Sequence, residues 1–426
     1  MAPVAPDLAP VGAEESGMAS GPANGGQRAA DGTAVDRADV VIVGGGIVGS
    51  AVAYFLAADP GIQGRAVVIE RDTGYRDGST ARSAGGVRQQ FSTPENVAMS
   101  QFTVAMFRRL ETLFGAQADV AFREQGYLIL GGSDGAAVLR DNVALQQSMG
   151  ADIALLDAAG LAARFPWLSA EGVAAGGLGQ SGEGWFDPPS LAGLFRNAAI
   201  AGGAAVIRDA VVGIDVAAGR VEAVRLASGG RLACGRHVNA AGAWAGQLAA
   251  LAGVDLPVTP HKRYVYVIDC REPPEALRRA PLTVDPSGVW FRPEGRLFLC
   301  GKSPAPDREP PPGDLDEIDH GFFEDEVWPR LAARVPAFES VKVVNAWAGY
   351  YDTNTLDHNA VIGAHPQVSN LYFANGFSGH GAQQAAAAGR AIAELIVYGA
   401  YHTIDLARLG YARIAADAPL RERNVI

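Results

Sequence analysis

The sequence predicts an α/β fold, in which a Rossmann-like dinucleotide-binding domain is combined with a second α+β domain built on a mixed, largely antiparallel sheet. The first observation is the stretch VIVGGGIVGS at 41–50, where β-branched apolar residues lead into a glycine turn and a helix. The second is the loss of this strand–helix–strand rhythm after residue 112, where alternating apolar runs take over. A length of 426 residues also favours two domains over one core.

The glycines of the first stretch have the GxGxxG spacing of a phosphate-binding turn. Gly44 allows the tight turn, Gly46 lets the backbone approach a pyrophosphate, and Gly49 allows the helix to pack closely on the strand. Ile47 and Val48 open the predicted helix, whose N-terminus favours phosphate binding. A tight turn that binds nothing is the alternative interpretation.

A second predicted strand, 66–69, completes the βαβ unit and ends on Glu70 and Arg71. Glu70 lies about 20 positions after Gly49, where a carboxylate can bind the hydroxyls of an adenosine ribose. This context makes the glycine motif specific, so we expect a dinucleotide cofactor here.

Composition argues against several classes of function. Asp and Glu number 46 against 35 Lys and Arg, a net charge of −11 that argues against a nucleic-acid or anionic-membrane surface. No apolar run approaches the roughly 20 residues that a membrane-spanning helix needs. The three cysteines are widely spaced and no histidine pair has metal-ligand spacing, so we expect neither disulfides nor a metal site. We expect a cytoplasmic protein with a disordered extension over 1–37.

A loop rich in Gly, Ser, Thr and Arg follows the second strand, over 71–92. Its backbone donors and hydroxyls suit a second pass over the pyrophosphate and ring of the cofactor. An exposed ion pair and a functional role are equally favoured for Arg82, whereas the neighbours of Arg88 favour function. The cofactor contacts predicted from this loop are Ser79, Thr80, Arg82, Ser83, Gly86, Val87 and Arg88.

The pattern in the middle of the chain predicts the elements of the second domain and further elements of the first domain. Thr93 is expected to cap a helix that begins at Pro94, and Pro188 to open another. The remaining expected helices are 134–149 and a short one within 154–168 that ends at Pro166. The expected strands are 121–130, 205–207, a hairpin over 211–226, 236–239, 258–269, and a hairpin over 289–299. The hairpin over 211–226 suggests a small antiparallel sheet riding on the nucleotide domain, and the acidic run 314–326 reads as the first turns of a solvated helix.

The last block contains a second glycine-rich turn. Predicted strands over 341–348 and 371–374 flank a loop at 350–363. The sequence NGFSGHG at 375–381 then precedes a long Ala-rich helix that reaches about residue 398. Glycines before a helix N-terminus form an electropositive nest, which would stabilise a redox ring that becomes anionic on reduction.

These segments together resemble the D-amino-acid-oxidase-like superfamily of FAD-dependent oxidoreductases, in the branch of the sarcosine oxidase β-subunit, glycine oxidase and FOXRED-like proteins. The matching pieces are VIVGGGIVGS with Glu70, GSTARSAGGVRQQFS, NAAGAWAGQLA, WAGYYDTNTLDHNAVIG and NGFSGHGAQQAAAAGRAIAEL, in the family's order. The resemblance implies FAD rather than NAD, in a discontinuous domain of the glutathione-reductase type over 38–112, 170–257 and 341–426. It places the substrate domain at 113–169 and 258–340.

The resemblance also implies chemistry and site residues. The expected reaction oxidises the C–N bond of a secondary amine or amino acid by hydride transfer to flavin N5, after which the imine is hydrolysed. Further FAD contacts are expected at Val211, Ala241, Gly242, Trp244, Gly376, Phe377, Ser378, Gly379, His380 and Gly381. The residues expected at the reacting atoms are Arg88, His380, Tyr264 and Tyr351, with Tyr266, Arg292 and Tyr350 as weaker candidates.

The sequence departs from the family pattern at three points. The cysteine and histidine that tether flavin in some relatives are missing, so FAD is expected to bind noncovalently. The lysine that promotes the oxygen reaction in one relative would fall near Leu299, with Lys302 displaced in register, so oxygen and another electron acceptor both remain open. Gln383 stands where that relative has a carboxylate-binding lysine.

Three other functions compete with amine oxidation. The same scaffold could oxidise a 2-hydroxy acid or glycerol phosphate, and FOXRED-like relatives invite a non-catalytic flavoprotein that serves as an assembly factor. An NAD-dependent dehydrogenase would require the later motifs to be coincidental. The expected partner is a small-molecule substrate, and the sequence leaves open whether the protein forms a homo- or hetero-oligomer.

Overall fold

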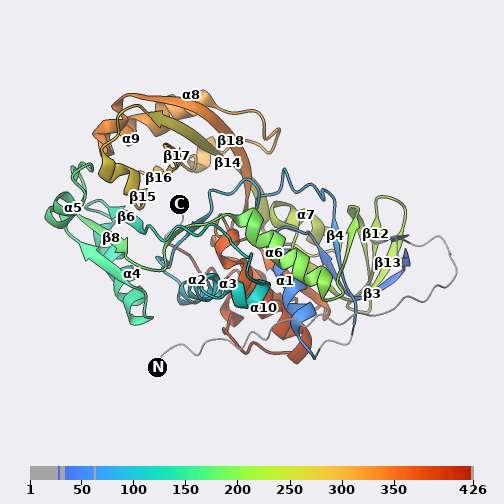
Figure 1. Ribbon diagram of the computed structural model, residues 1–426. Helices are drawn as coiled ribbons and strands as arrows, with labels where there is room; N and C mark the ends of the chain where they lie inside the picture. The colour runs from blue at the N-terminus through green and yellow to red at the C-terminus, as the bar shows by residue number, and fades with distance from the viewer. Residues whose placement is uncertain (1–26, 29–33, 62–63, 424–426) are drawn as a thin grey trace.

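The computed structural model describes residues 27–28, 34–61 and 64–423, whose strands form two eight-stranded sheets and two short two-stranded pairs. Figure 1 shows the two large sheets in different halves of the molecule, with α1, α2, α3 and α10 in the lower middle of the view and α8 and α9 at the top. The predicted α/β class and the mixed second sheet are both confirmed.

The first sheet has a parallel core made of strands that are far apart in the chain. Its order is β10-β4-β3-β13-β12-β11, and β20 extends it from β13 with β19 at its side. The strands are β3 (Arg37–Val43), β4 (Ala66–Glu70), β10 (Ala205–Arg208), β11 (Val211–Ala217), β12 (Arg220–Leu226), β13 (Arg231–Asn239), β19 (Val361–Ala364) and β20 (Leu371–Asn375). β3 and β4 are apolar on both faces because helices or further strands cover each side.

Helices cover both faces of this sheet. One face packs against α1 (Ile47–Ala58), α2 (Pro94–Phe107), α6 (Pro188–Ala201) and α10 (Gly381–Tyr398). The other face packs against α7 (Ala245–Ala250) and α11 (Ala412–Ala415). α1 and α10 approach closely because Gly389 carries no side chain, since a Cβ there would lie 2.6 Å from the Cβ of Ala51.

The second sheet is antiparallel except where β15 runs parallel to β6. Its order is β18-β14-β17-β16-β15-β6-β8-β7. The strands are β6 (Tyr127–Gly131), β7 (Ile153–Leu156), β8 (Ala175–Gly179), β14 (Val258–Cys270), β15 (Leu282–Val284), β16 (Trp290–Glu294), β17 (Leu297–Gly301) and β18 (Val341–Asn354). The remaining helices are α3 (Leu110–Phe114), α4 (Ala136–Ser148), α5 (Ala158–Arg164), α8 (His320–Phe322) and α9 (Trp328–Arg334).

Several expected boundaries are wrong. The strand expected from residue 121 begins at Tyr127, and the loop expected from residue 350 begins only after Asn354, because β18 pairs with β14 along that whole length. The first part of the acidic run, 314–319, is a loop rather than helix; the helical segment starts at His320 with Asp319 as its N-cap and continues past Trp328 as expected. β11 and β12 join the first sheet through β13 instead of forming a sheet of their own.

Sheet membership also differs from the expected domain limits. β8 and β18 hydrogen-bond into the second sheet, although both lie in the ranges 170–257 and 341–426 assigned to the FAD domain. Within the extension expected to be disordered, residues 27–28 pair with 34–35 as β1 (Gln27–Arg28) and β2 (Ala34–Val35), and Arg37 opens β3. The rest of that extension, 1–26 and 29–33, lies outside the described residues.

Candidate functional site

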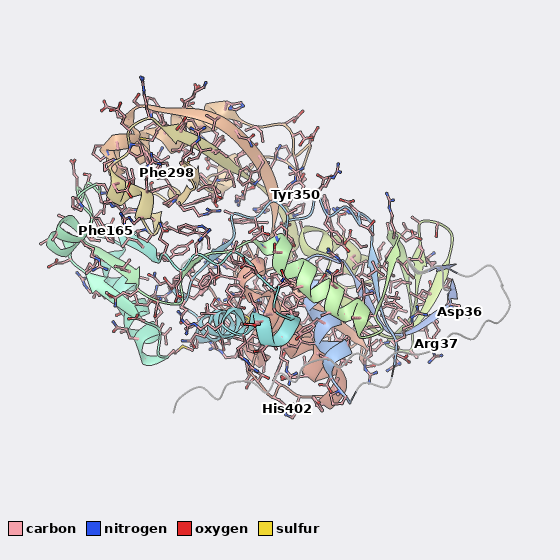
Figure 2. All side chains as sticks on the ribbon, in the orientation of Figure 1. Asp36, Arg37, Phe165, Phe298, Tyr350 and His402 are labelled. Carbon is pink, nitrogen blue, oxygen red and sulfur yellow. The ribbon has the colours of Figure 1, made fainter. Side chains whose placement is uncertain are left out.

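A cavity of about 560 Å³ lies between the two sheets and is lined by residues of both. At one end it reaches the turn between β3 and α1, and at the other it reaches Arg263 on β14 and Tyr351 on β18. Tyr350, the neighbour of Tyr351, marks the junction of the two halves of the molecule in Figure 2. An elongated molecule bound here would therefore contact both sheets.

The glycine turn at the first end has two different requirements for glycine. Gly44 has a φ of +102°, and a Cβ there would lie 2.3 Å from the carbonyl oxygen of Ala240. A Cβ on Gly49 would lie 1.9 Å from the carbonyl oxygen of Gly44. Both residues are thus required by the packing of the protein itself. Gly46 differs, because a Cβ there would meet only the Thr80 hydroxyl, 3.4 Å away, at the cavity.

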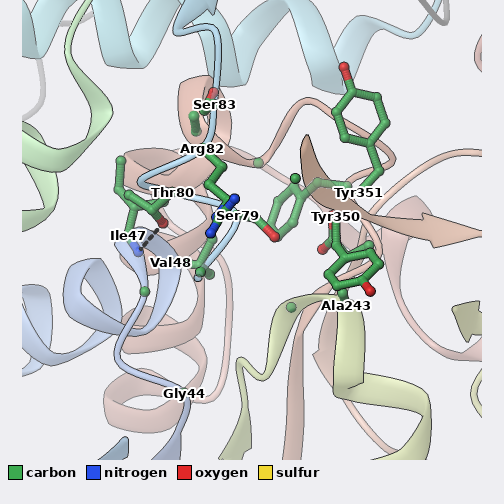
Figure 3. A pocket seen from close by; sticks show the side chains of 18 of the residues that line it. Gly44, Ile47, Val48, Ser79, Thr80, Arg82, Ser83, Ala243, Tyr350 and Tyr351 are labelled. Atoms are coloured by element: carbon green, nitrogen blue, oxygen red, sulfur yellow. Dashed lines mark hydrogen bonds between the residues drawn. The ribbon is translucent and has the colours of Figure 1, made fainter. Parts of the chain in front are cut away.

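Side chains from the next strand and loop order this turn. The two oxygens of Glu70 accept hydrogen bonds from the backbone N–H groups of Gly45 at 2.7 Å and Asp72 at 2.8 Å. The backbone N–H of Ile47, at the start of α1, donates to Thr80 Oγ1 at 3.0 Å, as Figure 3 shows. These bonds hold the loop that contains Thr80 against the N-terminus of α1, so that both face the cavity.

Most of the residues predicted to contact a cofactor line this cavity. Those that line it are Gly44, Gly46, Ile47, Val48, Glu70, Arg71, Ser79, Thr80, Arg82, Ser83, Gly86, Arg88, Val211, Ala241, Gly242, Trp244, Phe377, Gly379, His380 and Gly381. Gly49, Val87, Gly376 and Ser378 do not. Gly49 lies against the backbone of the turn, Val87 is fully buried, and Ser378 is buried with its hydroxyl accepting from the backbone N–H of Asn354 at 3.1 Å.

Arg88 and His380 form a buried pair at the other end of the cavity. Arg88 is 1% exposed, and its Nη2 donates to His380 Nε2 at 3.0 Å. The backbone N–H of Arg88 donates to Gln383 Oε1 at 2.8 Å, and its guanidinium lies 4.1 Å from the centre of the Phe91 ring. Because a guanidinium can only donate, His380 Nε2 accepts and the imidazole is neutral. Burial, assisted by the charge of Arg88, holds the pKa of His380 well below its usual value.

The tyrosines of the second sheet divide between its two faces. Tyr350 and Tyr351 project to opposite sides of β18 in Figure 3. Tyr351 lies against Gly379, where a Cβ would come within 2.4 Å of its ring, and the guanidinium of Arg263 lies 5.4 Å from the centre of that ring. Tyr264 borders the cavity, but its ring packs beside those of Tyr266 and Phe322. Since side chains alternate along a strand, this ring lies on the face opposite to Arg263.

Two weaker candidates lie outside the cavity. The hydroxyl of Tyr266 donates to the carbonyl of Asp319 at 2.5 Å within the outer core. Arg292 is 6% exposed, and its Nε donates to the carbonyl of Ala84 at 3.2 Å. These hydrogen bonds within the protein account for the positions of both side chains without a bound ligand.

Most of the wall above Arg88 is made of residues that the sequence motifs do not reveal. The additional lining residues there are Tyr127, Arg263, Val265, Leu282 and Trp290, from four different strands of the second sheet. The alternation of 258–269 was the one usable signal, because it places Arg263 and Val265 on one face. Lys302 also lines the cavity, and its Nζ forms an ion pair of 2.8 Å with Glu326, whereas Leu299 belongs to the core.

No cysteine or metal-binding cluster is found at this site among the residues that the structure describes. Cys234, Cys270 and Cys300 are buried away from the cavity lining. Within the described ranges, no three His, Cys, Asp or Glu side chains are grouped so that they could hold a metal ion. The described helices likewise include none that is long and apolar enough to cross a membrane. The expected cytoplasmic location stays a prediction.

Residues 39–395 match the model of the family described as DAO, FAD dependent oxidoreductase. The chain is 42% identical to FAD-dependent oxidoreductase domain-containing protein 1 of Xenopus laevis, over 92% of this chain and 85% of that protein. It is 27% identical to the glycine oxidase of Geobacillus kaustophilus, over 84% of this chain and 93% of that protein.

Solved structures give the same result. The crystal structure of L-proline dehydrogenase from P. horikoshii matches with a TM-score of 0.77 and 26% identity, covering 90% of this chain and 99% of that one. The structure of the G. kaustophilus glycine oxidase matches with a TM-score of 0.73, covering 88% of this chain and 98% of that one. The resemblance inferred from the motifs is therefore confirmed, and the chain belongs to the DAO family of FAD-dependent oxidoreductases.

Proposed function

We propose that this protein oxidises the C–N bond of a secondary amine or amino acid with a noncovalently held FAD. Sarcosine oxidase subunit beta, glycine oxidase and L-proline dehydrogenase are among its relatives, and their names all specify amino acids as substrates. The names support the substrate class.

The cavity fits FAD on two structural grounds. Gly46 leaves the cavity open beside the N-terminus of α1, where the positive end of the helix dipole favours a pyrophosphate. The cavity then continues past Thr80 and Ser79 towards Tyr351 and His380, so a long dinucleotide can extend from the first sheet to the second. The absence of cysteine from the described lining supports noncovalent binding. When bound, FAD supplies a two-electron acceptor for a hydride from the substrate.

Arg88 is the residue best suited to bind a substrate carboxylate. Its guanidinium lies in a buried compartment whose walls include Tyr127, Leu282 and Trp290. A charged hydrogen bond to a carboxylate is strong in such surroundings, because water competes poorly there. The apolar walls would hold the rest of a small amino acid and exclude water from the reacting carbon.

The state of His380 is the observation that distinguishes amine oxidation from alcohol oxidation. Its Nε2 accepts from Arg88, and a neutral imidazole carries its proton on the other nitrogen, so neither nitrogen offers a lone pair to substrate. A 2-hydroxy acid or glycerol phosphate needs a base for its hydroxyl proton. An amine that enters neutral needs no such base. The arrangement therefore favours the amine.

The test begins with the visible absorption spectrum of the purified protein before and after acid precipitation. Yellow colour that moves to the supernatant would support noncovalent FAD. Anaerobic mixing with N-methyl amino acids, D-amino acids, proline and 2-hydroxy acids should then bleach the flavin with amines only. Recovery of colour in air would indicate oxygen as the electron acceptor, and its failure would indicate another acceptor.

Other results would point to the alternatives. Bleaching by 2-hydroxy acids or glycerol phosphate alone would contradict amine oxidation. Bound flavin that no compound reduces would favour a non-catalytic assembly factor. The matched control is His380→Asn, which keeps a side chain able to accept from Arg88 but cannot act as a base. We expect that variant to reduce flavin within about tenfold of the wild-type rate, since general-base catalysis would cost more.

A further inference from the structure

A fully buried carboxyl group lies directly behind Arg88. Glu183 stands in the turn between β8 and β9 (Gly184–Trp185), and its side chain is 0% exposed. One carboxylate oxygen accepts from the backbone N–H of Gln89 at 2.5 Å, and the other accepts from Gln90 Nε2 at 2.8 Å. The carbonyl of Gln90 in turn accepts from the guanidinium of Arg88. Glu183 therefore holds the two residues that follow Arg88 in the chain.

The strand β8 provides the space for this carboxyl group. A Cβ on Gly179 would lie 1.8 Å from Glu183 Oε2, and a Cβ on Gly177 would lie 2.7 Å from Gln90 Oε1. Any side chain at these positions would displace Glu183 or Gln90. The glycines of β8 therefore leave the space that the Glu183 carboxyl group and the Gln90 amide group occupy.

The charge of Glu183 is linked to that of Arg88. Burial raises the pKa of Glu183 to about 7, while hydrogen bonds from Gln90 and Gln89 and the positive charge of Arg88 act in the opposite direction. Tyr127 on β6 also interacts with Glu183, and burial raises the pKa of Tyr127 to about 12, so it stays neutral. Glu124 accepts from the N–H of the adjacent Gly182, and Asp152 binds the nearby Ser181 hydroxyl at a more exposed position.

We propose that Glu183 is the internal counter-charge and positioning residue of Arg88, and that it takes up a proton from solvent when a carboxylate binds to Arg88. The proposal rests on the proposed function, since it assumes that Arg88 receives the substrate carboxylate. A bound carboxylate offsets the charge of Arg88, so the ionised form of Glu183 loses its stabilisation and faces a second anion in a region of low dielectric constant. Protonation of Glu183 removes that repulsion.

The test uses the FAD-bound protein and propanoate, a carboxylate with no amine to titrate. Its Kd is measured from the change in the visible spectrum between pH 6 and pH 9. Proton uptake is measured by titration calorimetry in MOPS and in imidazole, whose ionisation enthalpies differ. We expect the Kd to rise by up to about tenfold per pH unit above the pKa of Glu183. About half a proton should be taken up per propanoate bound at about pH 7, where Glu183 is already half protonated, and close to one at about pH 8.

Two variants test whether Glu183 causes the pH dependence of the Kd for propanoate. Glu183→Gln keeps an oxygen that accepts a hydrogen bond but cannot ionise, so its Kd should not vary over this pH range. Glu124→Gln is the matched control, since the Glu124 carboxylate accepts from Gly182 next to Glu183, and it should retain the wild-type slope. If Glu183→Gln does not fold, the pH slope and the proton uptake of the wild-type protein decide the question.

Two results would overturn the proposal. One is a wild-type Kd that is constant from pH 6 to pH 9 with no proton uptake, and the other is an unchanged slope in Glu183→Gln. A flavin-bound protein that binds no propanoate, but is reduced by amines, would refute the use of Arg88 while leaving amine oxidation standing. Binding of propanoate with no reduction by amines would refute the proposed reaction without touching Glu183.

Discussion

Replacement of His237 by leucine should remove a pH-dependent loss of stability. His237 lies in the middle of the first sheet, where it pairs with Val41 on β3 and Leu371 on β20. The side chain is 0% exposed, and neither ring nitrogen has a hydrogen-bond partner within the described structure. Burial lowers the pKa of this imidazole to about 4. Protonation inside this apolar core would leave a buried charge without compensation.

The magnitude follows from proton linkage. An unfolded histidine has a pKa of about 6.5, so between pH 6.5 and pH 4 the unfolded chain binds more protons than the folded chain. The free energy of unfolding therefore decreases as the pH is lowered through this range. At pH 7.5 His237 is neutral in both states and contributes almost nothing to this dependence. At pH 5 the linkage costs about 2 kcal/mol, which a leucine does not incur.

Urea unfolding, followed by circular dichroism, measures this effect at pH 7.5 and pH 5.0. The difference in the free energy of unfolding between His237→Leu and wild type should be about 2 kcal/mol more favourable to the variant at pH 5.0. The other histidines titrate in both proteins and cancel in the difference. His320→Gln, at an exposed position, serves as the control and should show no such change. A difference that is the same at both pH values would refute the reasoning.

Three further substitutions test three glycines, of which Gly46 and Gly49 lie at the start of α1 and Gly389 lies in α10. Gly49→Ala places a Cβ 1.9 Å from a backbone carbonyl, so the thermal midpoint should fall sharply, by the equivalent of about 3 kcal/mol or more. Gly46→Ala meets only a hydroxyl at 3.4 Å, so the protein should remain folded but bind FAD at least about tenfold more weakly in a flavin fluorescence titration; unchanged affinity would argue against a phosphate at this turn. Gly389→Ala forces α1 and α10 apart at a 2.6 Å contact and should cost about 1–3 kcal/mol in urea unfolding, with FAD affinity in the folded protein nearly unchanged.

The parts of the fold and site that sequence predicts well are local. The turn at Gly44 and Gly49 could be recognised because its glycine spacing and the apolar strand before it lie within one short stretch. The same holds for α10, where Gly381 follows a glycine-rich turn and an alanine-rich run continues to Tyr398. Helix α6 likewise begins at Pro188, because proline needs no backbone N–H partner in a first turn.

The parts that could not be predicted depend on partners distant in the chain. Asp352, Thr353 and Asn354 are typical of turns, yet they continue β18 because Pro260 and its neighbours on β14 pair with them. The shared face of Tyr264 and Tyr266 follows from alternation, but alternation does not reveal which face borders a cavity. Which face of β14 borders the cavity depends on where the first sheet packs.

Strand β13 lies between β3 on one side and β12 and β20 on the other, and this arrangement has a consequence for biosynthesis. Val41 pairs with His237, and His237 pairs with Leu371, so the central strands come from the beginning, middle and end of the chain. β18, the edge strand of the second sheet, is also synthesised late. A ribosome must therefore release most of the chain before either sheet can close, and until then exposed strand edges depend on chaperones or on rapid completion. High contact order of this kind also predicts slow folding.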